Sequence, residues 1–206
     1  MNKIKICGIT NTNDALECVK LKVDFIGFIF YKKSKRFINL EQAQTIIKSL
    51  NTEINKVGVF VNETTQVINE YVEALGLDYV QLHGEEQPKM IEEIKCKTIK
   101  AFSVGSSSLK EVVLEYDSEY WLFDSSDDNL KGGTGKSFDW NLITDIDSKN
   151  KIILSGGLNE NNIVSAIENR NINFFDICSG VESSPGHKDI QKLKSIVNLV
   201  KSWVIF

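Results

Sequence analysis

Short apolar runs alternate with amphipathic segments along the whole chain. Eight of these runs are apolar at consecutive positions, which is typical of parallel strands that are covered on both faces. The predicted strands are Lys3–Cys7, Asp24–Phe30, Lys56–Val61, Tyr79–His83, Thr98–Ser103, Tyr120–Asp124, Lys151–Ser155 and Phe174–Ser179. The segments between them predict helices near residues 13–21, 40–50, 64–75, 86–95, 108–116, 139–146, 160–169 and 188–202.

The alternation gives eight strand–helix pairs of about 26 residues each, close to the shortest length that such a unit needs. We predict an α/β fold, a single-domain (β/α)8 TIM barrel that spans residues 1–206 as one catalytic domain. A doubly wound open sheet is the alternative, because it uses the same alternation of elements. Eight regular units without a long insertion favour the closed barrel. No linker is visible, and proline occurs only at Pro88 and Pro185.

The composition is that of an ordinary globular protein, with 42% hydrophobic and 25% charged residues. The formal net charge of -4 is unsuited to nucleic acid or anionic lipid, so we expect neither a nucleic-acid nor a membrane partner. The first residues lack the apolar core of a signal peptide, and no apolar run approaches the length of a membrane span. We therefore expect a cytoplasmic protein.

The four cysteines are spread widely, and the chain has only two histidines. No Cys-x-x-Cys spacing occurs among Cys7, Cys18, Cys96 and Cys178. This pattern fits neither a zinc site nor the disulfide framework of a secreted protein. We expect reduced thiols and no bound metal, although the sequence leaves one disulfide bridge open.

Polar residues and glycines stand where the predicted strands end. In a barrel of parallel strands, catalytic groups gather at the carboxyl ends of the strands. Cys7 is the clearest case, because it ends a strand and is followed at once by Gly8. A buried cysteine is also a common core residue, so Cys7 alone decides nothing. The residues at these ends are Cys7, His83, Ser103, Asp124, Ser155, Gly156, Gly157, Ser179 and Gly180.

Two of the glycine groups predict a phosphate site. Gly156 and Gly157 follow the seventh strand, and Ser179 and Gly180 follow the eighth. Backbone amides without side chains beside them can converge on a phosphate in these two loops of a barrel. The alternative is that both segments are plain turns.

A third glycine group supplies a competing hypothesis. The segment Lys131-Gly132-Gly133-Thr134-Gly135-Lys136-Ser137 resembles a nucleotide-binding P-loop. The first glycine of that motif would fall on Leu130, and the loop does not follow a strand directly. An ATPase or kinase is therefore disfavoured, and we expect the loop around Gly133 to close over a ligand.

Several motifs occur together and in order, and they resemble the phosphoribosylanthranilate isomerases of tryptophan biosynthesis. The resemblance spans the chain and implies a (β/α)8 barrel. It also implies conversion of N-(5-phosphoribosyl)anthranilate, a small phosphorylated sugar substrate, into 1-(2-carboxyphenylamino)-1-deoxyribulose 5-phosphate without a cofactor. The motifs are Lys5-Ile6-Cys7-Gly8-Ile9-Thr10, Gln81-Leu82-His83-Gly84-Glu85-Glu86, Gly132-Gly133-Thr134-Gly135 with Phe138-Asp139-Trp140, Leu154-Ser155-Gly156-Gly157-Leu158, and Asp176 with Ser179-Gly180-Val181-Glu182.

This rearrangement of an aminoaldose to an aminoketose needs an acid to open the sugar ring and a base to remove the proton from carbon 2. Asp124 and Cys7, at the ends of strands six and one, suit these two roles. Freed backbone amides near Cys7 would lower the pKa of its thiol. The resemblance also implies that Arg36 binds the anthranilate carboxylate and that Asp176 contacts the anthranilate part.

The chain departs from the family at one place, because Lys35 stands where the family usually has proline. The loop that presents Arg36 therefore lacks a rigid φ constraint. His83 matches a family motif, but the residues assign it no chemical role.

Two other functions remain open at this point. A related phosphoribosyl barrel of the histidine pathway would use a carboxylate base where this chain has Cys7. A barrel that binds a phosphosugar without turnover would act as a sensor or scaffold, and a turnover assay distinguishes it. The sequence does not decide between a monomer and a homodimer.

Overall fold

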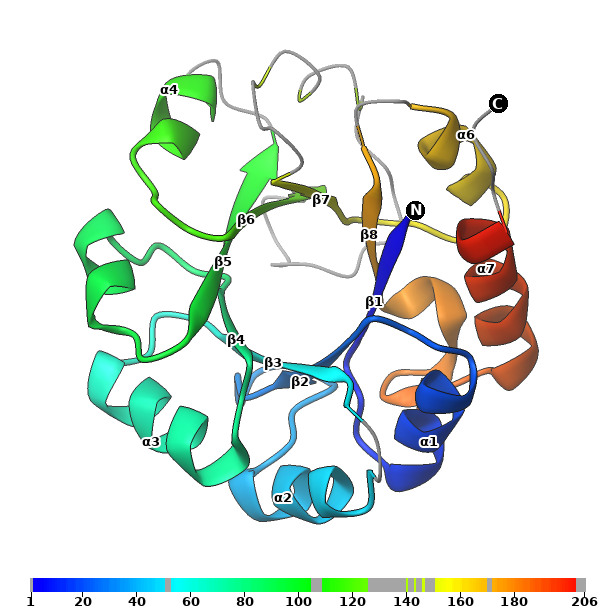
Figure 1. Cartoon of the computed structure of the whole chain (residues 1–206), viewed down its shortest axis with the longest axis horizontal. Coiled ribbons are helices and arrows are strands. Elements are labelled where there is room, and N and C mark those ends of the chain that lie inside the picture. Colours follow the sequence, from blue (N-terminus) through cyan, green and yellow to red (C-terminus); the bar gives the residue numbers. More distant parts are fainter. Residues whose placement is uncertain are drawn as a thin grey trace.

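The computed structural model describes residues 2–50, 53–104, 109–125, 140, 143, 146, 151–169 and 172–202. Within these residues, eight parallel strands follow one another around a closed barrel, and β1 completes the ring by pairing with β8 (Figure 1). The closed barrel is confirmed, and the open sheet is wrong. The strands are β1 (Lys3–Cys7), β2 (Phe25–Ile29), β3 (Asn55–Phe60), β4 (Tyr79–Leu82), β5 (Lys97–Val104), β6 (Tyr120–Ser125), β7 (Ile152–Leu154) and β8 (Phe174–Ile177).

Helices surround the barrel and pack on the outer face of its strands (Figure 1). Three of these helices are preceded by a residue whose side chain accepts a hydrogen bond from a backbone N–H of the first turn. These N-cap residues are Asn11, Asn39 and Thr64. None of the described helices is long and apolar enough to cross a membrane. The described α-helices are α1 (Thr12–Lys20), α2 (Leu40–Lys48), α3 (Thr65–Leu75), α4 (Leu109–Leu114), α6 (Ile163–Glu168) and α7 (Ile190–Ser202).

An aromatic layer fills the barrel at the amino ends of its strands. Phe25, Tyr79, Tyr120 and Phe174 are the first residues of the alternate strands β2, β4, β6 and β8, and all four are buried. Their ring centroids lie 5.2 Å apart for Phe25–Tyr79 and for Tyr120–Phe174, and 4.7 Å apart for Phe25–Phe174. Layers built by alternate strands are the usual filling of such a barrel. This end is therefore closed, which leaves the carboxyl ends of the strands for a binding site.

Two predicted elements differ from the structure or lie outside it. The helix expected near 86–95 is a short 3-10 helix, η1 (Pro88–Glu93). Pro88 stands at its first turn, and the Met90 N–H donates to the Gln87 carbonyl three residues earlier, so only tight turns form. Of the helix expected near 139–146, only Trp140, Ile143 and Ile146 are among the described residues.

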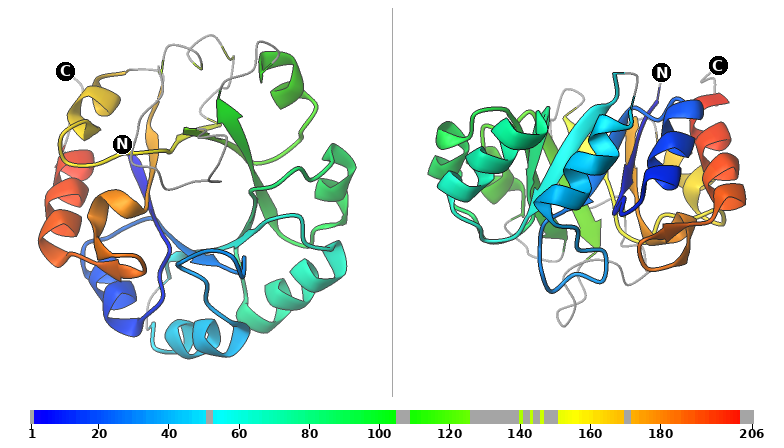
Figure 2. Two further views of the ribbon diagram at one scale, coloured as in Figure 1. Left: turned by 180° about the vertical axis from the view of Figure 1, so that it is seen from behind. Right: turned by 90° about the horizontal axis from the view of Figure 1, so that it is seen from below.

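The chain after β8 forms structure that the hydrophobic pattern does not predict. A 3-10 turn, η2 (Ser179–Val181), leads into a small hairpin of β9 (Glu182–Ser184) and β10 (His187–Lys188). Gly186 has a φ of +84°, which its lack of a side chain permits in this tight turn. In the side view of Figure 2 the hairpin and the loop after β2 lie at the same end of the barrel.

Candidate active site

A cavity of about 580 Å³ opens at the carboxyl ends of the strands. Four of the predicted site residues line it, namely Cys7, Arg36, Asp124 and Asp176. Each comes from a different place in the fold, because they belong to β1, the loop after β2, β6 and β8. The barrel therefore brings together a thiol, a guanidinium and two carboxyl groups from positions far apart in the sequence.

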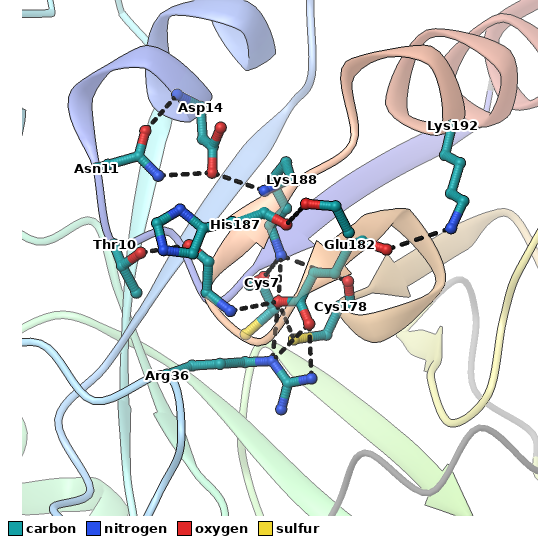
Figure 3. Close-up of polar contacts among 12 residues, drawn as sticks. Cys7, Thr10, Asn11, Asp14, Arg36, Cys178, Glu182, His187, Lys188 and Lys192 are labelled. Atoms are coloured by element: carbon teal, nitrogen blue, oxygen red, sulfur yellow. Dashed lines mark hydrogen bonds and ion pairs between the residues drawn. The ribbon is translucent and has the colours of Figure 1, made fainter.

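Cys7 lies at the end of β1, and its side chain faces Cys178, which follows β8 (Figure 3). The hydrogen bond from the Cys178 thiol lowers the pKa of Cys7 well below its ordinary value, and nearby Lys5 and Lys188 act in the same direction against burial. The direction agrees with the sequence-based expectation, but the cause differs. The side chains of Cys178, Lys5 and Lys188, instead of freed backbone amides, favour the thiolate.

Lys5 and Asp176 form a buried ion pair directly below the thiols. The Lys5 Nζ atom lies 3.0 Å from both carboxylate oxygens of Asp176, and the Lys5 side chain is fully buried. Burial raises the pKa of Asp176 to about 7, although Lys5 opposes the shift, and the negative Cys7 adds to it. Burial alone would lower the pKa of Lys5, but Asp176 and Cys7 outweigh it and raise that pKa. Lys5 is therefore a fixed positive charge beside Cys7.

Asp124 lies in β6 and shares a contact with His83, which directly follows β4. The His83 Nε2 atom is 3.5 Å from Asp124 Oδ2, and Gln81 Nε2 donates to His83 Nδ1 at 2.8 Å. With its Nδ1 accepting, His83 has its ring proton on Nε2, toward Asp124. The buried Asp124 Oδ1 has no hydrogen-bond partner within the described part of the chain. A buried polar atom of this kind beside a cavity is suited to a polar group of a ligand.

Arg36 is oriented by Glu182 of β9. Its Nε atom lies 2.8 Å from Glu182 Oε1, and its Nη2 atom lies 2.7 Å from Oε2, so the contact is bidentate. The Lys188 Nζ atom lies 3.0 Å from Oε1 of the same carboxylate. In Figure 3 the second terminal nitrogen of Arg36 points away from Glu182. The guanidinium is thus held along one edge and presents another edge to a ligand.

The loop before Arg36 is ordered without the proline that the family usually has there. The Arg36 N–H donates to the Ser34 hydroxyl at 3.1 Å, and the Ser34 N–H donates to the Tyr31 carbonyl at 2.9 Å. These bonds and the contact with Glu182 replace the missing φ constraint at Lys35.

The glycines of the predicted phosphate site lie in tightly packed loops. Gly156 and Gly157 have φ values of +83° and +66°, and a side chain at Gly156 would collide with the Ser125 backbone nitrogen. A side chain at Gly180 would collide with the Leu158 carbonyl, so the loops after β7 and β8 pack on each other through this glycine. Ser155 lines the cavity, whereas the described lining does not include Gly156, Gly157, Ser179 or Gly180. The phosphate site remains a prediction, and Gly133 lies outside the described residues.

Comparison with known proteins decides the family. The family profile described as N-(5'phosphoribosyl)anthranilate (PRA) isomerase matches residues 4–199 of this chain. The chain belongs to the N-(5'-phosphoribosyl)anthranilate isomerase family. The expected resemblance is confirmed, and with it the class of protein, an isomerase of the TIM-barrel fold.

Relatives of this family match over almost their whole length. The isomerase of Pelobacter propionicus is 42% identical over 201 residues, which cover 98% of this chain and 96% of that protein. The crystal structure of the Thermotoga maritima phosphoribosylanthranilate isomerase has a TM-score of 0.89 and 39% identity, and the match covers 98% of this chain and all of that one. A phosphoribosylanthranilate isomerase in complex with reduced 1-(o-carboxyphenylamino)-1-deoxyribulose 5-phosphate has a TM-score of 0.85 and 37% identity, with 98% and 100% covered.

Proposed function

We propose that this chain converts N-(5'-phosphoribosyl)anthranilate into 1-(2-carboxyphenylamino)-1-deoxyribulose 5-phosphate, with Asp124 as the general acid and Cys7 as the general base. The observation that supports this assignment most directly is that both side chains line one cavity from strands on different sides of the barrel. Groups placed in this way can reach the ring oxygen and carbon 2 of one bound sugar.

The reaction then proceeds in two proton transfers. Asp124 gives its proton to the ring oxygen, the bond between that oxygen and carbon 1 breaks, and the anthranilate nitrogen forms a Schiff base with carbon 1. The Cys7 thiolate removes the proton from carbon 2, and the electron pair moves to the Schiff base to give an enolamine. The enolamine tautomerises to the ketose product. Lys5 supports the second transfer because its charge stabilises the thiolate.

Binding of the substrate uses groups at the rim of the cavity. Arg36 pairs with the anthranilate carboxylate, and Asp176 contacts the anthranilate part. The phosphate binds at the loops that contain Gly156, Gly157, Ser179 and Gly180. A cytoplasmic location belongs to the same proposal, because a free Cys7 thiolate requires a reducing compartment.

A turnover assay tests the function. Phosphoribosylanthranilate is made in situ, and loss of its anthranilate fluorescence is followed after the protein is added. We expect loss of fluorescence that depends on the protein and that the Cys7→Ser variant largely lacks. Binding of the substrate without any turnover would instead show a phosphosugar-binding protein and would contradict the proposal.

The Arg36→Ala variant should lower kcat/KM about 10- to 150-fold, since a hydrogen bond to a charged group contributes roughly 1.5–3 kcal/mol. Arg36→Lys should restore little of this loss, because lysine keeps the charge but not the planar fork. Lys32→Ala is the matched control, because the exposed Lys32 is outside the cavity lining. If Arg36→Ala and Lys32→Ala lowered kcat/KM by the same small factor, and if both losses faded as the salt concentration rose, the two side chains would contribute only diffuse electrostatic attraction for the substrate. The partner of the substrate carboxylate would then be another residue.

Inorganic phosphate should compete with the substrate. A preformed anion site binds the free ion weakly, so we expect a higher apparent KM and an unchanged kcat at phosphate concentrations on the order of tens of millimolar. Chloride at the same ionic strength controls for screening. If phosphate and chloride act alike, the loops after β7 and β8 do not form the predicted site.

A further inference from the structure

Cys7 ends β1, and Cys178 directly follows the neighbouring strand β8. The register of β1 and β8 pairs Lys5 with Asp176 and Ile6 with Ile177, so Cys7 and Cys178 are the next pair. Neighbouring strands are about 4.8 Å apart, which is inside the range of about 4.4–6.8 Å between the Cα atoms of a disulfide. Both residues line the same cavity, and the Cys178 thiol donates to Glu182 Oε1 at 3.9 Å. All four cysteines of the chain are free.

The surroundings of the pair give the two sulfur atoms different reactivities. Cys7 is the more acidic thiol, because Cys178, Lys5 and Lys188 all favour its charged form. The pKa of Cys178 is raised well above its ordinary value, first by its hydrogen bond to Cys7 and by burial, whereas Lys188 and Arg36 oppose the shift. A thiolate beside a neutral thiol is the arrangement of an attacking and a resolving cysteine.

We propose that Cys7 and Cys178 form an oxidisable dithiol, at which a peroxide produces a reversible disulfide. The inference goes beyond the proposed function, but its effect on turnover rests on Cys7 as the base. The peroxide is a small molecule and reaches both sulfur atoms through the cavity, because both residues line it.

The chemistry balances in two steps. The Cys7 thiolate attacks one peroxide oxygen, a sulfur–oxygen bond forms, the oxygen–oxygen bond breaks, and hydroxide leaves. Cys7 is then a sulfenic acid, oxidised by two electrons that the peroxide has accepted. The Cys178 thiol loses its proton and attacks the Cys7 sulfur, the sulfur–sulfur bond forms, and the oxygen leaves as water. An external dithiol reverses the oxidation by exchange.

Oxidation of Cys7 in the first step favours the attack by Cys178 in the second. While Cys7 is negative, its charge and its hydrogen bond keep the proton on Cys178. Once Cys7 is an uncharged sulfenic acid, that influence is gone, and Lys188 and Arg36 favour ionisation of Cys178. Oxidation of Cys7 therefore removes the first cause of the raised pKa of Cys178, while burial still opposes ionisation of that thiol. Rapid formation of the disulfide protects Cys7 from irreversible oxidation to the sulfinic acid.

The test uses the reduced full chain treated with hydrogen peroxide. In denaturant, the free thiols should fall from four to two, and peptide mapping without reductant should find the Cys7–Cys178 link. The Cys96→Ser variant is the matched control and should still form the link, because its pair is intact. The Cys178→Ser and Cys178→Ala variants should form no link, and a sulfenic-acid reagent should label Cys7 in them.

Turnover is measured on the same peroxide-treated samples. We expect kcat to fall by about 10²-fold or more as the link forms, the usual effect of losing a positioned base, and to return with dithiothreitol. Sulfinic acid at Cys7 without the link, a link through Cys18 or Cys96, or a disulfide between two chains would overturn the proposal. A complete link with unchanged kcat would overturn the effect on turnover.

Different measurements would contradict the proposed disulfide and the proposed function. The link is identified from peptides, whatever reaction the protein catalyses. The proposed function is assayed on the reduced protein, where absent turnover would contradict it even if the link forms.

Discussion

The Cys7→Ser variant should lower kcat by about 10²–10⁴ while substrate binding stays near normal. The range is the usual effect of a positioned proton transfer, and serine keeps the size of the side chain while lacking an accessible anion near neutral pH. Turnover is measured by loss of anthranilate fluorescence. Binding is measured by calorimetry with reduced 1-(o-carboxyphenylamino)-1-deoxyribulose 5-phosphate, the ligand of a structurally similar isomerase.

Cys96→Ser is the control for this variant, because Cys96 precedes β5 and is outside the cavity lining. It should retain normal turnover. If Cys7→Ser and Cys7→Ala both retained near-normal kcat, Cys7 would have no place in the mechanism, and the low pKa of its thiol would serve another purpose.

The Asp124→Asn variant should lower kcat by a similar factor of about 10²–10⁴, because the amide cannot give a proton to the ring oxygen. Asparagine keeps the shape of the side chain and retains an acceptor for His83. Binding of the reduced product analogue should therefore survive. Fluorescence and calorimetry again separate turnover from binding.

Asp117→Asn is the matched control, since the Asp117 carboxylate is fully exposed, precedes the amino end of β6 and is outside the cavity lining. It should leave both quantities unchanged. If Asp124→Asn abolished binding in a protein with unchanged circular dichroism, Asp124 would be a binding residue, and the acid would have to be another group.

The hydrophobic pattern is sufficient to predict the barrel. Strands that are buried on both faces give continuous apolar runs, and the first of them was predicted with the bounds that β1 has, Lys3–Cys7. The pattern fails for β9 and β10, which have three and two residues and are too short to show a period. It also cannot distinguish an α-helix from the 3-10 helix at Pro88, because both place apolar residues on one side.

The structure places Cys7 and Asp124, which the sequence marks as polar strand ends, in the lining of one cavity, and their catalytic roles stay predictions. The supporting charges were missed. Lys5 lies inside an apolar run, and its partner Asp176 is 171 positions away in the sequence. Glu182 follows a glycine turn, and nothing in its neighbourhood indicates that it orients Arg36. Such pairs arise only when β1 and β8 meet at the closure of the barrel.

The sequence places His83 at a strand end but does not predict its contact with Asp124. His83 follows a buried strand, as Asp124 ends one, and the strand order then places both side chains at the same rim. Its contact with Asp124 makes it a positioning residue for the proposed acid. For Gly180 the sequence predicts a phosphate site, and the close packing of Gly180 on the Leu158 carbonyl is a contact that the glycine pattern does not predict.

Among the residues that the structure describes, the aromatic layer closes the barrel at the amino ends of the strands, and the cavity opens at the carboxyl ends. Phe174 is fully buried, and the rings of Phe25, Tyr79 and Tyr120 close the space around it. On the proposed function, substrate and product would both use the opening at the carboxyl ends, and each carries a phosphate and a carboxylate. We therefore expect the product to compete with the substrate for this one cavity.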